Sequence, residues 1–155
     1  MIKEEIKKKY GELAKEYKLP SFKELNDDFE IEEIEKNNEN FLRTIRKFMM
    51  KKIFNSLEFL EMLGNPQNPP RLYLNYIMSI SQEEKKENDV LYSSLGELIL
   101  NSLSLEINPS EKKEAEAIKK IYSVWNSQKE RFKKIIDKIQ KPNNIINKKE
   151  KTYFG

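Results

Sequence analysis

Residues capable of acid–base or metal chemistry are scarce in this sequence. Its 155 residues include no histidine and no cysteine. This removes the commonest general base, the usual activator of a nucleophile and the soft metal ligands. We therefore expect no catalytic residue, no cofactor and no metal site, and a protein that is not an enzyme.

Pairs of carboxylates are the remaining arrangement with catalytic potential. Glu58 and Glu61 lie three residues apart, as do Glu84 and Glu87, and carboxylate oxygens alone can hold Mg²⁺. An Mg²⁺-dependent nucleotide hydrolase with helix-borne carboxylates is therefore an alternative function. The spacing is common by chance among 26 acidic residues, and no phosphate-binding glycine loop, nucleophile elbow or zinc-ligand spacing accompanies it.

Positive charge gathers toward the end of the chain. The last 15 residues hold four lysines and one glutamate, whereas the other residues carry equal numbers of acids and bases. A contiguous positive surface binds nucleic acid through counterion release, although cations near a helix C-terminus also complement the helix dipole. We expect RNA, a ribonucleoprotein or another acidic partner to dock here. The expected binding residues are Lys129, Arg131, Lys133, Lys134, Lys138, Lys141, Lys148, Lys149 and Lys151.

A second basic patch occurs earlier, in a segment without acids. Its members are Arg43, Arg46, Lys47 and Lys51. Spacing of four residues lines Arg43, Lys47 and Lys51 along one helix face, which could follow a phosphate backbone. The acidic run from Glu24 to Glu35 offers partners within the chain, so internal pairing or plain solvation is the favoured interpretation.

The last residues have the form of a docking peptide. Tyr153 and Phe154 end a charged linker, as in short motifs that insert aromatic side chains into a pocket. The string Lys151-Thr152-Tyr153-Phe154 resembles the C-terminal peptides by which archaeal replication proteins dock on sliding clamps. Glu150 stands where that motif usually has glutamine, and no further aromatic residue follows. An ordinary flexible chain end is the alternative.

Six segments with helical spacing of apolar residues must position these groups, and none shows the sustained alternation of strands. The first ends before Pro20, and capping boxes predict helix starts at Ser21 and Ser81. Three prolines mark the strongest boundary, after Gly64, which we expect to be a left-handed helix cap. The remaining helices are expected over Asn40 to Leu63, over Arg71 to Ile80, and from Pro109 or Ser110 to before Pro142.

These elements predict an all-α fold: a single-domain helical bundle of about five to six helices over residues 1–140, with two long helices as its frame. A flexible basic tail, residues 141–155, follows it. The uncharged segment from Leu72 to Ile80 is either the middle of the core or a buried interface. A protein–protein adaptor or homo-oligomer that uses this segment is therefore the other alternative function.

Two parts of the sequence resemble small uncharacterised all-helical proteins of archaea. They are the string Leu19-Pro-Ser-Phe-Lys-Glu24 and the helix that runs from Glu114-Ala-Glu-Ala-Ile118 onward to Trp125. The resemblance implies no activity.

The longest uncharged stretch, Leu72 to Gln82, is too short to span a membrane, and acids occupy the start where a signal peptide is apolar. We expect a soluble, cytoplasmic, non-enzymatic interaction protein without a membrane partner, and the sequence leaves its oligomeric state open.

Overall fold

The computed structural model describes residues 2–35, 39–65 and 67–141. Over these residues the chain forms six α-helices, one short 3₁₀ turn and no strand, so the predicted all-α class is confirmed. The elements in chain order are α1 (Ile2–Tyr17), α2 (Phe22–Phe29), the turn η1 (Ile31–Glu33), α3 (Phe41–Gly64), α4 (Arg71–Ser79), α5 (Gln82–Ile107) and α6 (Glu111–Gln140).

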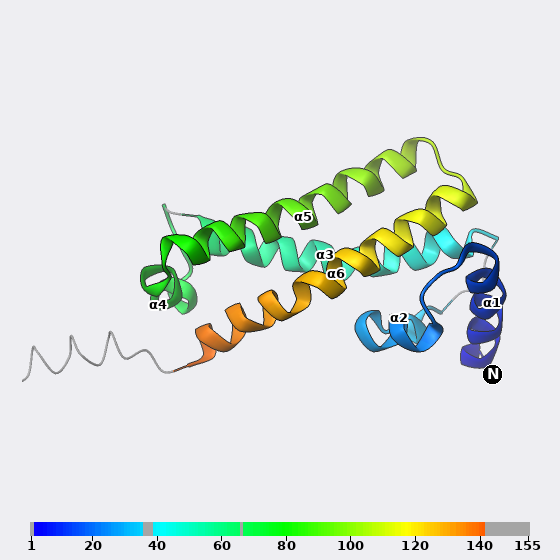
Figure 1. Cartoon of the computed structure of the whole chain (residues 1–155), viewed down its shortest axis with the longest axis horizontal. Helices are drawn as coiled ribbons and strands as arrows, with labels where there is room; N and C mark the ends of the chain where they lie inside the picture. Colours follow the sequence, from blue (N-terminus) through cyan, green and yellow to red (C-terminus); the bar gives the residue numbers. More distant parts are fainter. Residues whose placement is uncertain (1, 36–38, 66, 142–155) are drawn as a thin grey trace, which may run out of the picture.

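The three longest helices form the frame of the bundle. Helices α3, α5 and α6 each pack against the other two. Helix α4 lies at one end of this frame, beside the last turns of α6, and α1 and α2 lie at the other end (Figure 1). The sequence predicted two frame helices, and α5, with 26 residues, is the third.

Helix starts follow local side-chain chemistry. The predicted capping box is present at Ser21: its hydroxyl accepts from the Glu24 backbone, and the Ser21 N–H donates to the Glu24 carboxylate. Ser81 and Ser110 likewise accept from the third amide of α5 and α6. Each contact satisfies an amide that the first helical turn leaves unpaired.

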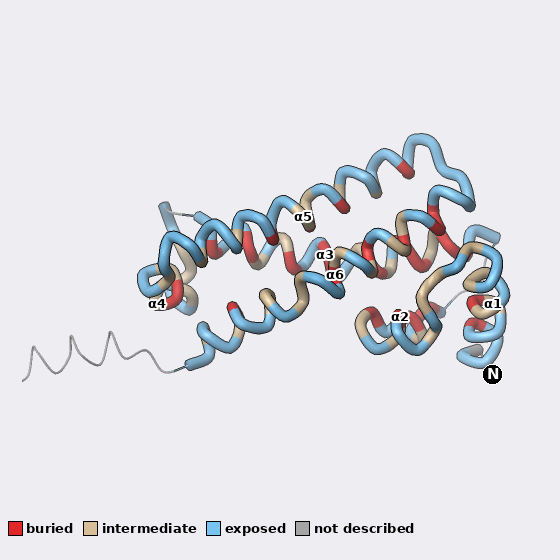
Figure 2. The backbone as a smooth tube through the Cα atoms, in the orientation of Figure 1, coloured by how far each residue is buried: buried red, intermediate tan, exposed pale blue. Residues whose placement is uncertain are grey.

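The core lies where the frame helices face one another, and their outer sides are exposed (Figure 2). Its centre contains Ile45, Met49, Ile53, Leu91, Leu95, Leu98, Ile118, Ile121 and Trp125. At one end, Tyr17 of α1 donates a 2.6 Å hydrogen bond to Glu111 of α6. The periodic apolar positions of the sequence therefore correspond to this inner surface.

In the middle of the chain, the expected left-handed cap at Gly64 is wrong, and one of the two alternatives for the segment from Leu72 to Ile80 is excluded. Gly64 is the last residue of α3 and has no positive φ, because the helix ends at Asn65 in extended backbone instead of a left-handed cap. Helix α4 is not in the middle of the core: Tyr76 is buried, but Leu74 is 39% and Met78 60% exposed on the opposite face. A terminal position lets α4 bury only one side.

A buried ion cluster joins the three frame helices. Arg46 of α3 is 1% exposed and binds Glu114 of α6, itself 3% exposed. The same guanidinium donates to Ser102 and to Glu106 of α5, at 2.7 Å from the Glu106 carboxylate. One side chain therefore links all three helices by charge-assisted hydrogen bonds.

Substitution of Arg46 tests how strongly the fold depends on this cluster. Arg46→Ala leaves the Glu114 carboxylate buried without a counter-charge, so we expect the free energy of unfolding to fall by about 3–5 kcal/mol. Urea denaturation followed by circular dichroism measures this change.

Two further variants serve as controls. Arg43→Ala removes a more exposed cation that binds Glu106 and should cost less than about 1 kcal/mol. Arg46→Met combined with Glu114→Leu should recover most of the loss, because no unpaired buried charge remains. Equal losses for Arg43→Ala and Arg46→Ala would contradict a special role for the cluster.

Candidate interaction surfaces

Several cations of the predicted nucleic-acid site on α6 are engaged within the molecule. Lys138 binds Glu84 of α5 at 2.8 Å, and Arg131 binds Glu87 at 2.6 Å. Lys129 lies 3.5 Å from Asp28 of α2. These residues therefore also attach α6 to its neighbours.

Other members of that predicted site remain open to solvent. Lys133, Lys134 and Lys141 are exposed, and no ion pair joins them to any residue that the structure describes. Glu130 and Asp137 lie among them on the same stretch of helix. Lys148, Lys149 and Lys151, like Tyr153 and Phe154 of the predicted docking peptide, lie outside the described residues.

The second basic patch is divided between the interior and the surface. Arg46 is buried, Arg43 binds Glu106 at 2.5 Å, and Lys47 lies 3.6 Å from the same carboxylate. Lys51 is exposed and stacks over Phe48, 5.3 Å from the ring centroid. The favoured interpretation was internal pairing or plain solvation, and the first three side chains are paired internally.

The partners of this patch differ from those expected. The acceptors are Glu106 and Glu114, which follow Arg46 by 60 and 68 residues of sequence, and not the carboxylates of the acidic run from Glu24 to Glu35. The expected partners were wrong for these three cations because sequence proximity favoured the run, whereas packing brings α5 and α6 against α3.

Three of the four carboxylates of the hydrolase alternative are bound to other side chains of the chain. Glu61 accepts a 2.8 Å hydrogen bond from Tyr92, while Glu84 and Glu87 bind cations of α6. Over the described ranges of the chain, no group of three or more acidic side chains is placed to hold a metal ion. The two predicted pairs are not brought together as one metal site.

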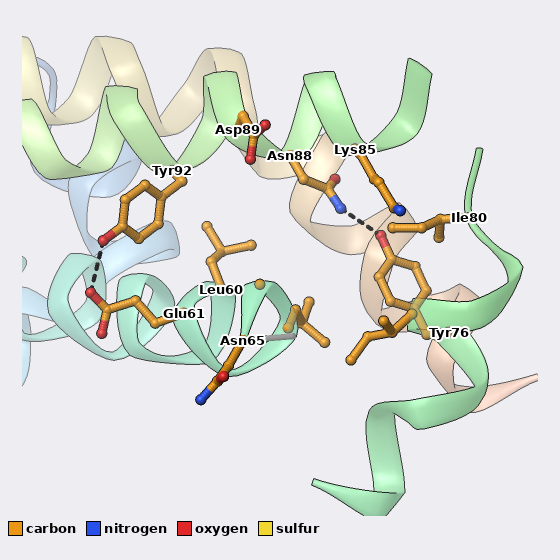
Figure 3. A pocket seen from close by; sticks show the side chains of 12 residues that line it. Leu60, Glu61, Asn65, Tyr76, Ile80, Lys85, Asn88, Asp89 and Tyr92 are labelled. Carbon is orange, nitrogen blue, oxygen red and sulfur yellow. Dashed lines mark hydrogen bonds between the residues drawn. The ribbon is translucent and has the colours of Figure 1, made fainter. Parts of the chain in front are cut away.

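A cavity of about 470 Å³ lies between the end of α3, the inner side of α4 and the start of α5 (Figure 3). Its lining residues are Leu60, Glu61, Leu63, Gly64, Asn65, Tyr76, Ile77, Ile80, Lys85, Asn88, Asp89 and Tyr92. Leucine, isoleucine and tyrosine side chains supply apolar lining, and Glu61, Lys85 and Asp89 add charges.

Hydrogen bonds fix two walls of this cavity. Asn88 donates to the Tyr76 hydroxyl at 2.8 Å, and its carbonyl oxygen accepts from Arg131 of α6 at the same distance. Tyr76 is 3% exposed, and burial raises the pKa of its hydroxyl. The ring is therefore held in place by α4, α5 and α6 together.

The cavity has the character of a site for an apolar group with polar neighbours. Its volume is within the range of ligand pockets, which combine apolar walls with a few polar groups. The cavity could not be predicted from the sequence, because its lining comes from three helices. The signals were the proline-rich turn, which folds α4 back, and the apolar segment from Leu72 to Ile80.

Acid titration tests the contribution of Glu106. Hydrogen bonds from Arg46 and Arg43 lower the pKa of its carboxyl from 4.5 to about 2, so its ionised form stabilises the fold above pH 4.5 and this stability is lost as the pH falls toward 2. We expect the free energy of unfolding of Glu106→Gln to vary less over this window than that of the unmodified protein.

Denaturant titrations at a series of pH values measure this difference. Glu130→Gln, at an exposed position of α6, should keep the original slope. The account of Glu106 is wrong if Glu106→Gln and Glu130→Gln have the same pH profile.

No family model, curated protein or solved structure matches this chain. The resemblance to archaeal proteins therefore stays a prediction. None of the helices in the described part of the chain has the length and apolar character needed to cross a membrane.

Proposed function

We propose that this chain is a non-enzymatic interaction protein that binds a segment of another protein in the cavity between α3, α4 and α5. The cavity carries this proposal, since it is large enough for one or two apolar side chains of a partner. An adaptor role that uses the segment from Leu72 to Ile80 was already an alternative from the sequence. Tyr76, Ile77 and Ile80 of that segment line the cavity.

Charge around the cavity favours a particular partner chemistry. Glu61 and Asp89 contribute two carboxylates against the single ammonium group of Lys85. Complementary charge guides association and fixes register. The proposed partner segment therefore carries an apolar anchor residue flanked by basic residues.

The outer side of α4 favours a macromolecular partner over a small molecule. Leu74 is 39% and Met78 60% exposed, and both occupy the helix face opposite Tyr76. Exposed apolar surface is typical of protein interaction sites. A protein can contact this outer face of α4 as well as the cavity on its inner side, which a small molecule in the cavity cannot do. We place this interaction in the cytoplasm.

Nucleic-acid or ribonucleoprotein binding at the end of α6 is the second candidate function. Lys133 and Lys134 support it, because both are exposed and have no ion-pair partner among the described residues. Glu130 and Asp137, interleaved with them, and the internal pairing of Lys138 reduce the positive potential of this surface. Protein binding at the cavity is therefore better supported.

Affinity capture from native lysate, with and without nuclease, tests the proposal when two cavity variants are compared with a control. Gly64→Phe adds a side chain at the cavity wall where a Cβ meets nothing within 4 Å, and Asp89→Lys reverses a lining charge. We expect both to reduce recovery of a nuclease-resistant partner at least about tenfold, while Asp137→Lys on α6 retains it.

Two results would contradict cavity binding. If both cavity variants recover the same partner as the unmodified protein, the cavity is not its site. If nuclease abolishes recovery and Lys133→Glu with Lys134→Glu does the same, the second candidate function replaces the first.

A further inference from the structure

The outer face of α5 exposes a continuous row of large apolar side chains. Leu100 is 68%, Leu103 58% and Ile107 86% exposed. Their spacing of three and four residues sets them on one side of the helix, opposite the buried positions Leu95 and Leu98. In Figure 2 the backbone on the outer side of α5 is coloured as exposed. The second half of α5 is therefore apolar on both sides.

This row continues toward the start of the helix with small residues. Ser93 and Gly96 occupy the preceding positions of the same face. These positions and the three large residues are uncharged, and Glu97 borders them on one side, where it pairs with Lys120 of α6. We call Ser93, Gly96, Leu100, Leu103 and Ile107 the α5 stripe.

Among the described residues no close neighbour excludes a Cβ at Gly96, as is also true of Gly11 and Gly64. Glycine inside a helix costs about 1 kcal/mol relative to alanine, yet Gly96 has no positive φ, and a Cβ built on it meets nothing within 4 Å. Neither backbone conformation nor packing in the monomer requires it. A close approach by another molecule would supply a reason for its small size.

The neighbouring helix extends the surface beside Gly96. Contacts of Arg43 with Glu106 and of Glu61 with Tyr92 fix the antiparallel register of α3 and α5, and this register sets Phe54 of α3 level with Gly96. Phe54 is 49% exposed. With the three large residues of the stripe, it presents on the order of 500 Å² of apolar surface, over half of what each partner contributes to a standard interface.

We propose that the α5 stripe binds the same stripe of a second copy, with the two helices antiparallel and crossing at Leu100. This arrangement sets Ile107 of each copy over Ser93 of the other, and Leu103 over Gly96. The large side chains at the end of one stripe then pack against the small residues at the start of the partner's stripe. Such self-complementarity is what a two-fold interface requires. An uncharged stripe also brings no like charges together on the two-fold axis.

The molecular mass in solution tests this dimer. We expect sedimentation equilibrium of the full chain to give a mass that rises with concentration toward twice the 18.5 kDa of one chain. Leu100→Arg places two like charges at the crossing point and should weaken the dimer at least about a hundredfold.

Gly96→Leu distinguishes close packing of the two helices from non-specific hydrophobic association. It adds apolar surface at a position where a Cβ meets nothing within 4 Å in the monomer, so it would strengthen non-specific association but blocks the proposed approach, and we expect it to weaken the dimer at least about tenfold. Gly11→Leu is the matched control, since Gly11 lies inside α1 with equally open space around its Cβ, and it should leave the dimer unchanged.

Cross-linking tests the antiparallel register. The chain contains no cysteine, so Leu100→Cys introduces a single thiol close to its own symmetry mate. We expect it to form an intermolecular disulfide on mild oxidation, as should a mixture of Ser93→Cys with Ile107→Cys. Ser123→Cys, at an exposed position of α6, should remain largely uncross-linked.

Three results would overturn the proposal. The first is the mass of a single chain at every concentration up to about 1 mM. The second is a dimer that withstands both Leu100→Arg and Gly96→Leu. The third is equal cross-linking of Leu100→Cys and Ser123→Cys.

Discussion

The register of the long helices is constrained by the guanidinium of Arg46, which is buried among α3, α5 and α6. Its partners Glu114, Glu106 and Ser102 come from the other two helices. Charge buried in this way is tolerated only when it is paired and hydrogen-bonded. Sliding any one helix by a turn would separate Arg46 from a partner, so the cluster selects one register among the many that apolar packing alone would accept.

This register determines which surfaces are left for other molecules. With α3 and α5 antiparallel, α4 folds back at one end and bounds the cavity with Tyr76 and Ile80. The same packing turns Leu91, Leu95 and Leu98 inward and leaves Leu100, Leu103 and Ile107 outside. The cavity and the large residues of the α5 stripe therefore lie toward opposite ends of α5, although the cavity residues Asp89 and Tyr92 border Ser93 at the start of the stripe.

Local features of the sequence predicted most of the fold. Capping serines at positions 21 and 81, the prolines after α3 and the helical spacing of apolar residues each act over a few residues, so they indicate where helices begin and end. Local features could not predict the sites that depend on which helices pack together. The partners of Arg46 and Lys138 come from distant helices, and many acidic residues were equally eligible. The cavity and the exposed side of α4 likewise require knowledge of which helices meet.

Hydrogen exchange resolved by residue, measured on the full chain under native conditions, tests most directly whether the Arg46 cluster is the centre of stability. We predict that backbone amides near Arg46, Ser102 and Glu114 exchange only through global unfolding and share the highest protection. Amides of α1 and α4, which lie at the two ends, should exchange through local opening. Higher protection in α1 or α4 than around Arg46 would contradict this account.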